Sequence, residues 1–345
     1  MHRLELNSMS LLELKDFFIS INEKSFRGEQ AFTYFHKNNK WELKNLKVLP
    51  LKLREELIET TRVNEIKLDE KFSSKIDETD KYLFVLEDNN IIESVAMKYK
   101  HGTTVCISTQ VGCKMGCSFC ASTKEGLIRD LTPAEMLNQI YMIEKDLNKD
   151  ISNIVLMGSG EPLDNYENTL KFLNIIHHEK GHNISYRNIT LSTCGIVPRI
   201  YDLAKENLPI TLSVSLHSAF DEARKEIMPI ANKYSIKEIM EACKYYETKT
   251  KRRITFEYTL IDGVNDREKD ARELSKILRG LNAHVNLIAL NPIKEYEKQR
   301  SSKSNIEKFK QEMTKYNIPV TIRREMGSDI SASCGQLRRS IINKN

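Results

Sequence analysis

Gly112-Cys113-Lys114-Met115-Gly116-Cys117-Ser118-Phe119-Cys120 places three cysteines within one short loop, in the spacing C-x3-C-x2-C. A run rich in β-branched residues, 103–109, comes directly before it and predicts a strand. A closed structural zinc site needs four ligands, and no fourth cysteine or ligand-spaced histidine follows within 121–126. Three cysteines on a [4Fe-4S] cluster leave one iron open for a reactant. The spacing therefore indicates a soft-metal site that performs chemistry.

Strands and helices alternate after this loop. Repeated βα units predict a parallel sheet with helices outside it. About six or seven units are present, fewer than the eight of a closed barrel. We therefore expect an α/β fold with a partial (β/α) barrel, although the spacing leaves a doubly wound sheet open. The predicted strands are 153–157, 188–193, 211–216, 254–260, 285–290 and 320–322, and the clearest helices are 133–147, 166–177 and 236–248.

The first seventy or so residues have helical periodicity instead. Helices are predicted at 9–18, 26–35 and 50–58, and a hairpin follows with strands at 82–86 and 91–99. We divide the chain into a small N-terminal helical domain (1–75) that could contact RNA, a connecting β-hairpin (76–98), the barrel (99–328) and a C-terminal segment (329–345).

Lysines surround the chain's only tryptophan, Trp41, within 36–44. Such a run can bind nucleic acid by charge and stacking. A solvated helix face with Trp41 in a small core is the interpretation we favour.

Composition sets broad limits. The 345 residues carry a formal net charge of +5 and are 40% hydrophobic, which permits an anionic partner without establishing one. No apolar run is long enough to cross a bilayer, and the first residues lack a signal-peptide core. Seven cysteines, an odd number with three in one loop, are not a disulfide framework. We expect a cytoplasmic protein without a membrane partner.

Polar residues and glycines stand where the predicted strands end. Ligands bind at the carboxyl ends of parallel strands, so we expect these residues to line one rim. Each is weak evidence alone, because a polar residue at a strand end is often only part of a turn. The segments at these predicted strand ends are Gly158 to Pro162, Ser192 to Gly195, Ser215 to Ser218, and Asn291 with Pro292.

The cysteine spacing resembles the signature of the radical SAM enzymes. Further segments are similar to the RlmN/Cfr family of radical SAM RNA methyltransferases, and most similar to its RlmN branch, in order along nearly the whole chain. One departure is Ser159, where the family often has an apolar residue; it affects only local packing. The segments are 158–163, 191–195, 213–217, 228–230 and 333–337.

The resemblance implies a cofactor set and a ligand set. Cys113, Cys117 and Cys120 would hold the [4Fe-4S] cluster, whose open iron chelates S-adenosylmethionine. One electron then cleaves the nucleotide to methionine and a 5′-deoxyadenosyl radical. The S-adenosylmethionine contacts that the family implies are Gly160, Glu161, Ser192, Ser215, Leu216, His217 and Asn291.

Two further cysteines gain roles only from the resemblance, since a lone cysteine is usually a small core residue. Cys334 matches the family's methyl acceptor, Cys106 its redox partner and Glu93 its proton acceptor. Two S-adenosylmethionine molecules are used per turnover, one to methylate Cys334 and one to generate the radical. The resulting methylene radical adds to adenine, and Cys106 releases the product through a transient disulfide.

The resemblance also implies the substrates. They are C2 of an adenine in 23S rRNA (position 2503 in the usual rRNA numbering) and of adenine 37 in tRNA, with an electron donor such as flavodoxin or ferredoxin. The motif Gly160-Glu161-Pro162-Leu163 resembles this branch more than the branch that performs Cfr-type methylation at C8 of the same rRNA adenine, because Cfr proteins tend to have alanine after the glutamate. Basic side chains near the C-terminal site could hold phosphates or be merely solvated: Arg323, Arg324, Arg338 and Arg339.

Two rival functions stay open at this point. A non-catalytic iron-sulfur electron carrier would hold a cluster that is indifferent to S-adenosylmethionine. A zinc-stabilised RNA-binding module would need a distant fourth ligand such as His101 or His217.

Overall fold

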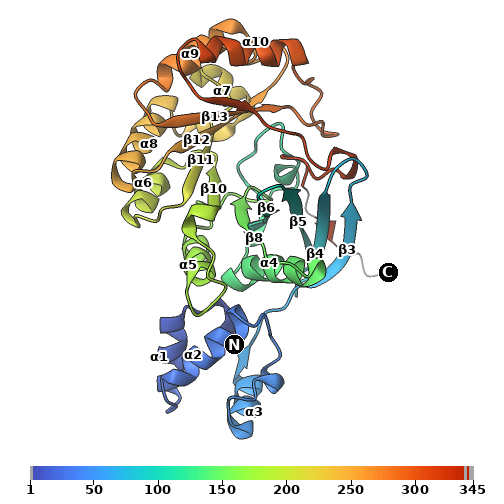
Figure 1. The fold of residues 1–345 in the computed structure, drawn as a ribbon, viewed down its shortest axis with the longest axis vertical. Helices are drawn as coiled ribbons and strands as arrows, with labels where there is room; N and C mark the ends of the chain where they lie inside the picture. The colour runs from blue at the N-terminus through green and yellow to red at the C-terminus, as the bar shows by residue number, and fades with distance from the viewer. Residues whose placement is uncertain (1–2, 338–339, 342–345) are drawn as a thin grey trace.

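The computed structural model describes residues 3–337 and 340–341 (Figure 1). The strands are β1 Leu4–Glu5, β2 Thr61–Arg62, β3 Lys67–Ser73, β4 Thr79–Val85, β5 Asn90–Tyr99, β6 Gly102–Cys106, β7 Gln110–Gly112, β8 Leu127–Asp130, β9 Asn153–Leu156, β10 Ile189–Thr193, β11 Thr211–Ser215, β12 Ile254–Leu260, β13 Ala283–Ala289, β14 Val320–Ile322 and β15 Ser340–Ile341. The α-helices are α1 Leu11–Ser20, α2 Phe26–His36, α3 Leu51–Thr60, α4 Pro133–Leu147, α5 Tyr166–His177, α6 Val197–Lys205, α7 Asp221–Ile227, α8 Ile236–Thr250, α9 Glu268–Ile277 and α10 Lys303–Thr314.

One 11-stranded sheet forms the centre of the molecule. Its order is β14-β13-β12-β11-β10-β9-β6-β5-β4-β3, with β15 also paired to β5. The seven strands from β6 to β14 are parallel and follow one another in chain order. A doubly wound sheet reverses its strand order at a switch point, and this one does not. The predicted partial barrel is confirmed, since β14 and β3 end the sheet without pairing to each other.

The inner parallel strands are largely buried because helices cover their outer side (Figure 1), whereas β14 at the end of the sheet is partly exposed. Every residue of β12 is buried, including the polar residues Thr255, Glu257 and Thr259, which alternate along one face of the strand. Helix α4 begins where Thr132 and Glu135 form a capping box with proline at the first turn. It ends at Asn148, which adopts a left-handed conformation. Its predicted bounds, 133–147, are those of the structure.

The antiparallel strands β3, β4 and β5 extend the sheet beyond β6. The predicted hairpin is present as β4 and β5, but it belongs to the central sheet. Strand β3 is a correction, because the first 75 residues were interpreted as helical. It is an edge strand with nearly every side chain exposed, so Lys67–Ser73 shows no apolar alternation from which a strand could be recognised.

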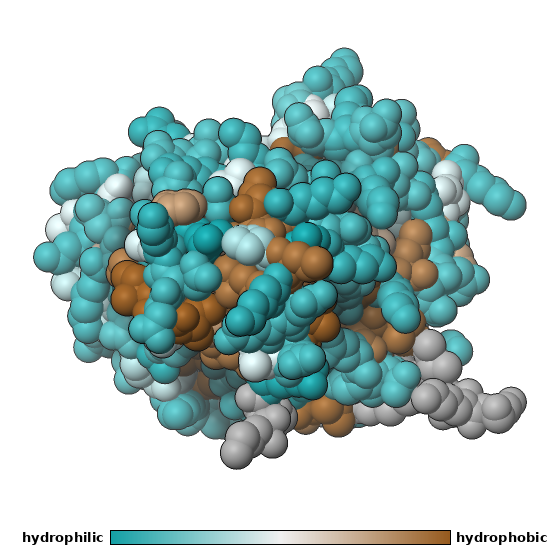
Figure 2. All heavy atoms as spheres, turned by 90° about the horizontal axis from the view of Figure 1, so that it is seen from below, coloured by the Kyte–Doolittle hydropathy of each residue, from teal (hydrophilic) through white to brown (hydrophobic). Residues whose placement is uncertain are grey.

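The N-terminal helices α1, α2 and α3 form a small unit at the lower end of the molecule in Figure 1. Seen from below, this end is mostly hydrophilic with apolar groups between the polar ones (Figure 2). Trp41 packs against the main core, with its ring 6.5 Å from that of Tyr141 on α4. Trp41 is thus a packing residue, as favoured, but the predicted helix face is wrong, because the residue lies in the loop between α2 and Leu43–Asn45 and packs on the main core.

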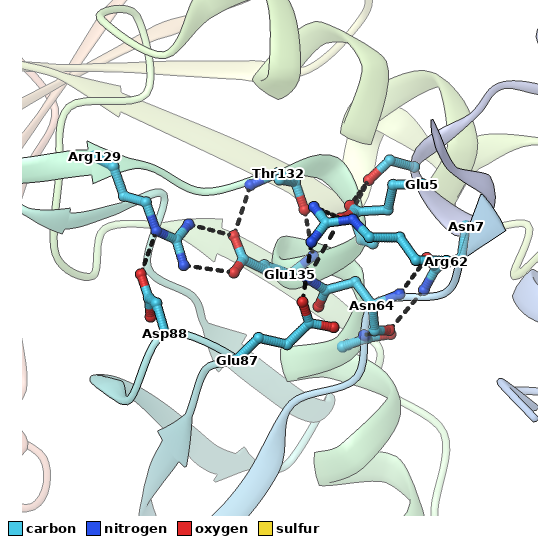
Figure 3. A network of polar contacts seen from close by, with 12 residues as sticks. Glu5, Asn7, Arg62, Asn64, Glu87, Asp88, Arg129, Thr132 and Glu135 are labelled. Carbon is cyan, nitrogen blue, oxygen red and sulfur yellow. Dashed lines mark hydrogen bonds and ion pairs between the residues drawn. The ribbon is translucent and has the colours of Figure 1, made fainter. Parts of the chain in front are cut away.

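Polar contacts fix this unit to the barrel (Figure 3). Arg62 forms ion pairs with Glu5 at 2.5 Å and with Glu87 at 3.0 Å, joining β2 to the turn after β4. Asn138 on α4 donates to the Asn64 carbonyl at 2.9 Å, and the Ala134 amide donates to the Ser8 hydroxyl at 3.0 Å, so α4 also holds the unit. Within the barrel, Arg129 donates to both oxygens of the buried Glu135 at 2.8 Å, a geometrically specific bidentate pair that fixes β8 on α4.

Among the residues that the structure describes, no helix is both long enough and apolar enough to cross a membrane.

Candidate active site

A cavity opens where the carboxyl ends of the parallel strands meet. It encloses about 940 Å³ including its mouth, a size typical of sites for small molecules and cofactors. Its wall contains most of the residues predicted for the cluster and for S-adenosylmethionine. These are Cys113, Cys117, Cys120, Gly160, Glu161, Ser192, Ser215, His217 and Asn291. The predicted methyl acceptor Cys334 is on the same wall.

The cysteine loop is held by its neighbours on three sides. The Cys113 amide donates to the Gly126 carbonyl at 3.1 Å, within the β7–β8 hairpin that frames the loop. The Ser118 amide donates to the carbonyl of Ile227 on α7 at 3.0 Å. On the third side, the Ala121 amide donates to the Gly335 carbonyl at 2.7 Å. The loop is therefore tied to the barrel and to the C-terminal segment.

The donor set fits an iron-sulfur cluster. Three thiols face one cavity, yet no three His, Cys, Asp or Glu side chains in the described part of the chain converge on a single metal ion. Cluster ligands bind different irons, so they stand further apart than the ligands of one ion. Burial raises the pKa of the Cys113 thiol to about 12, and coordination to iron is what deprotonates such a thiol at neutral pH.

A buried cation beside the loop supports the same fit. Arg224 on α7 is fully buried and donates from Nε to the Leu216 carbonyl and from Nη2 to the Cys194 carbonyl. Its Nη1 has no hydrogen-bond partner among the described residues. A buried charge without compensation is costly, and three thiolates on a cluster would supply negative charge next to it. Sequence reasoning missed Arg224, because a single arginine in a charged helix carries no signal.

Glu161 is 4% exposed and its carboxylate is already engaged. Oε1 accepts from the Leu163 amide at 3.0 Å and Oε2 from the Cys194 amide at 2.7 Å. Burial raises its pKa, and these backbone donors oppose that rise. Each oxygen keeps a second lone pair, so the carboxylate can still accept from an ammonium group in the cavity.

Gly160 has a structural reason to be glycine. Its φ is +108°, and a Cβ there would lie 2.7 Å from the Gln110 amide nitrogen and 2.7 Å from the Gln110 Cβ. Gln110 in turn accepts from the Glu161 amide at 2.8 Å. The glycine thus allows the loop to approach β7 and brings Glu161 to the cavity wall.

Ser192 on β10 and Ser215 on β11 both line the cavity. Leu216 differs from them, because its side chain is fully buried in the main core and is absent from the cavity wall. Its backbone N–H and C=O are used by Glu257 and Arg224. The predicted contact through Leu216 remains a prediction, and it could only involve the backbone.

His217 adopts a left-handed conformation with φ +54°. Its Nδ1 accepts from the Thr259 amide at 2.9 Å, so the neutral ring carries its hydrogen on Nε2. Burial, with a smaller contribution from Arg224, lowers its pKa to about 3. The ring lies edge-on to Phe119 of the cysteine loop and offers one N–H donor at neutral pH.

Cys334 lies where the C-terminal segment meets the cavity. The Asn291 amide group donates to the Cys334 carbonyl at 2.9 Å, and the Ser122 hydroxyl donates to the Leu337 carbonyl at 2.8 Å. Asn291, predicted to contact S-adenosylmethionine, therefore also positions the cysteine. Cys334 is half-buried and contributes to the walls of two adjoining cavities.

The second cavity places Cys106 with Cys334. Cys106 on β6 is buried and stands opposite Val95 on β5. Glu93 is two residues before Val95 on the same strand, so alternation puts its side chain on the same face as Cys106. Glu93 is 8% exposed, and the Lys81 ammonium lies 3.5 Å from its Oε1. The three residues predicted for the reaction are thus gathered on one side of the sheet.

Two charged residues of this region have positions that their sequence context did not indicate. Arg323 lines both cavities, and Glu257 on β12 is 3% exposed and lines the first. A polar residue within an apolar strand gives only a weak signal, which is why Glu257 was missed. Arg324 lines the second cavity, whereas Arg338 and Arg339 lie outside the described residues.

Comparison with known proteins agrees with this geometry. Residues 107–274 match the Radical SAM superfamily, and residues 4–63 match the ribosomal RNA large subunit methyltransferase N-terminal domain. Of the curated proteins, a probable dual-specificity RNA methyltransferase RlmN of Clostridioides difficile is 54% identical, covering 95% of each chain. One from Clostridium beijerinckii is 55% identical, covering 98% of this chain and 96% of its own. A solved radical SAM methyltransferase from Sphaerobacter thermophilus is 41% identical, with a TM-score of 0.91 over 97% of this chain and 99% of its own.

Proposed function

Because the chain belongs to the RlmN family of radical SAM RNA methyltransferases, we propose that it methylates C2 of an adenine in 23S rRNA and of adenine 37 in tRNA. Methylation passes through a methyl group carried by Cys334. A [4Fe-4S] cluster on Cys113, Cys117 and Cys120, together with S-adenosylmethionine, supplies a radical able to take hydrogen from that methyl group. Two molecules of S-adenosylmethionine are consumed, and a flavodoxin or ferredoxin in the cytoplasm delivers the electron.

One observation carries the proposal: Cys334 lies on the wall shared by two cavities. The first contains the three loop cysteines, where the radical would form. The second contains Cys106. A methyl acceptor has to face the radical source first and its resolving thiol afterwards, and a side chain on the shared wall meets both requirements.

The chain's own residues then have distinct tasks. Glu161 and the Nε2–H of His217 offer an acceptor and a donor for S-adenosylmethionine in the first cavity, and Asn291 holds the backbone of Cys334. Glu93 receives the proton from the adenine ring. The Cys106 thiolate attacks the Cys334 sulfur and frees the product, leaving a Cys106–Cys334 disulfide. The product keeps the methylene carbon as its methyl group.

Adenine C2 requires this route because it is an electron-poor amidine carbon without nucleophilic character. It therefore cannot take the methyl group from the sulfonium of S-adenosylmethionine by direct displacement. A cysteine thiolate is nucleophilic and can accept the methyl group first.

Nucleoside mass spectrometry tests the proposal. The reconstituted protein is incubated anaerobically with S-adenosylmethionine, a reductant and either a 23S rRNA fragment or tRNA, with synthetic standards for both isomers. We expect 2-methyladenosine from both RNAs. The 8-methyl isomer would assign Cfr-type chemistry instead, and unmodified adenosine despite an intact cluster would refute the substrate assignment.

A further inference from the structure

We infer that Arg323 is a positioning residue for the Cys106–Cys334 pair, held in place by Glu257 so that its guanidinium stabilises the Cys106 thiolate. The inference rests on the proposed function, in which Cys106 attacks the Cys334 sulfur. It gives Arg323 a role inside the protein, whereas the sequence left open a contact to phosphate or a solvated position.

Burial makes Cys106 a poor nucleophile by itself. The residue lies between Val95 of β5 and Val155 of β9 in the sheet. Its side chain packs into a cluster of apolar residues that includes Met326. Desolvation raises the pKa of its thiol to about 12, with a smaller contribution in the same direction from Cys334. Since only the thiolate attacks sulfur, the site needs a group that favours the charged form.

Arg323 is that group. It follows β14 and its amide donates to the Leu287 carbonyl at 2.8 Å, continuing the ladder with β13. Its side chain is 26% exposed, its Nη1 is 3.7 Å from the Met157 sulfur, and it lines the cavity shared by the two cysteines. Cys334 foremost, then Glu257 and Cys106, hold the pKa of Arg323 above its usual value against the effect of burial. Arg323 in turn opposes the rise in the pKa of Cys106.

Glu257 gives the guanidinium a fixed anchor. Its Oε1 accepts from the Ser213 hydroxyl at 2.9 Å and from the Asn286 amide group at 3.0 Å. Its Oε2 has no hydrogen-bond partner among the described residues and lies 3.7 Å from Arg323 Nη1. A carboxylate so deeply buried is stable only when it is paired. The pair therefore directs Arg323 into the barrel and away from solvent.

The other charged and titratable groups around Cys106 come from several neighbouring elements. Glu93 and Lys81 lie further along the same face of β5 and β4, and they are paired with each other. Arg324 is exposed. The titratable and charged side chains on the wall of the second cavity are Tyr99, Cys106, Arg323, Arg324, Glu325 and Cys334.

The release step balances with the groups named. The Cys106 thiolate forms an S–S bond to Cys334 as the bond from the Cys334 sulfur to the methylene carbon breaks. The electron pair of that bond passes to the methylene carbon, which takes up a proton and becomes the methyl group. The two sulfurs are oxidised by two electrons and the carbon is reduced by two. Arg323 acts at the start, where the attacking sulfur must be negative.

Thiol reactivity tests the inference without requiring turnover. The anaerobic holoenzyme is treated with the small thiolate-selective reagent methyl methanethiosulfonate across a pH series, and modification of Cys106 is followed by peptide mass spectrometry. We expect Arg323→Met to move the midpoint of Cys106 modification upward by about one pH unit, since a nearby opposite charge changes a pKa by roughly that much or more. Arg323→Lys, which keeps the charge, should restore most of the shift.

Arg324→Met is the matched control, because it removes the same charge from the exposed neighbouring residue and should leave the midpoint unchanged. Cluster content and circular dichroism of each variant show whether it is folded. An unchanged midpoint in folded Arg323→Met, or a shift of equal size in Arg324→Met, would overturn the inference.

A second measurement separates this inference from the proposed function. Cys106→Ala should trap RNA crosslinked to the protein. In Arg323→Met, which keeps Cys106, the crosslink should decay about tenfold more slowly than in the wild type at pH 7, and its decay should speed up as the pH rises and more of the Cys106 thiol is ionised. Free methylated RNA from Cys106→Ala would refute the proposed release step, whereas the thiol midpoints would still decide the role of Arg323. A crosslink that decays at the wild-type rate in Arg323→Met would refute that role alone.

Discussion

Several polar groups in this active site serve two partners at once. Glu161 accepts from two backbone amides with one carboxylate while facing the cavity, and Asn291 holds the Cys334 carbonyl from the same cavity wall. Groups that are already hydrogen-bonded are restricted in rotation, so the site is organised before a ligand enters. Substitutions here should therefore change both geometry and chemistry.

The two reactive cysteines have opposite expected phenotypes. Cys334→Ala removes the methyl acceptor, so methylated RNA should fall below detection. Cys106→Ala leaves the acceptor but removes the resolving thiol, so covalent RNA–protein adducts should accumulate. Denaturing gel electrophoresis with labelled RNA distinguishes the two. Cys243→Ala, in a fully buried position of the main core, is the control and should still release methylated RNA; unmethylated, uncrosslinked RNA from Cys106→Ala would contradict the assignment.

The positive charge of Arg224 should make the midpoint potential of the cluster less negative. Reduction adds negative charge next to its buried guanidinium, which favours the reduced state. Arg224→Met should therefore shift the midpoint potential to more negative values, and Arg224→Lys should lie between it and the wild type. Redox titration followed by EPR measures this. Arg187→Met, on a residue without predicted site contact, is the control; equal potentials in the wild type and a folded Arg224→Met would refute the effect.

At the scale of elements, the loops between strands and helices determine the site. The strand-end motifs predicted the cavity wall well, because parallel strands deliver their carboxyl ends to one edge whatever their exact bounds. Side chains acting through tertiary contacts were not predictable. Arg224 looks like an ordinary charged residue in sequence, and Arg323 suggested only a contact to phosphate or solvent. Their positions depend on the packing of α7 on the cysteine loop and of Arg323 against Glu257.

The loop after β9 should be intolerant of a side chain at Gly160. Gly160→Ala adds backbone strain of about 1–3 kcal/mol, together with overpacking against Gln110 of similar size. We expect the free energy of unfolding to fall by roughly 3 kcal/mol and binding of S-adenosylmethionine to weaken, measured by urea denaturation and by calorimetry. Gly263→Ala is the control, since Gly263 also has a positive φ but an added methyl group there would meet nothing within 4 Å. Equal losses in the two variants would show that contact with Gln110 is unimportant.

At the scale of the whole molecule, the N-terminal helices and the barrel share buried polar groups. His36 at the end of α2 lies 3.3 Å from the hydroxyl of Tyr141 on α4, and it is almost completely buried. Burial lowers its pKa to about 3, with a smaller contribution from His178. The folded protein therefore keeps this ring neutral under conditions in which the unfolded chain would protonate it.

This linkage predicts acid sensitivity. The unfolded histidine titrates near pH 6.5 and the folded one near 3, so the unfolded state binds more protons between these values. The stabilisation is complete above about pH 6.5 and is lost as the pH falls toward 3, by up to about 1.4 kcal/mol per pH unit for each such group. His36→Phe should reduce the slope of unfolding free energy against pH between about 6 and 4, measured in urea. An unchanged slope would mean that His36 does not titrate on unfolding.

The contacts between the cysteine loop and the C-terminal segment also impose an order of assembly during synthesis. The hydrogen bond from Ser122 to Leu337 joins residues 215 positions apart. At about 5–20 residues per second, a ribosome makes the loop roughly 10–40 s before its partner. In that interval the C-terminal segment has not yet been made and does not cover the three cysteines. An iron-sulfur delivery protein can therefore reach them on the nascent chain. The cysteine that accepts the methyl group arrives afterwards and closes a site whose metal can already be in place.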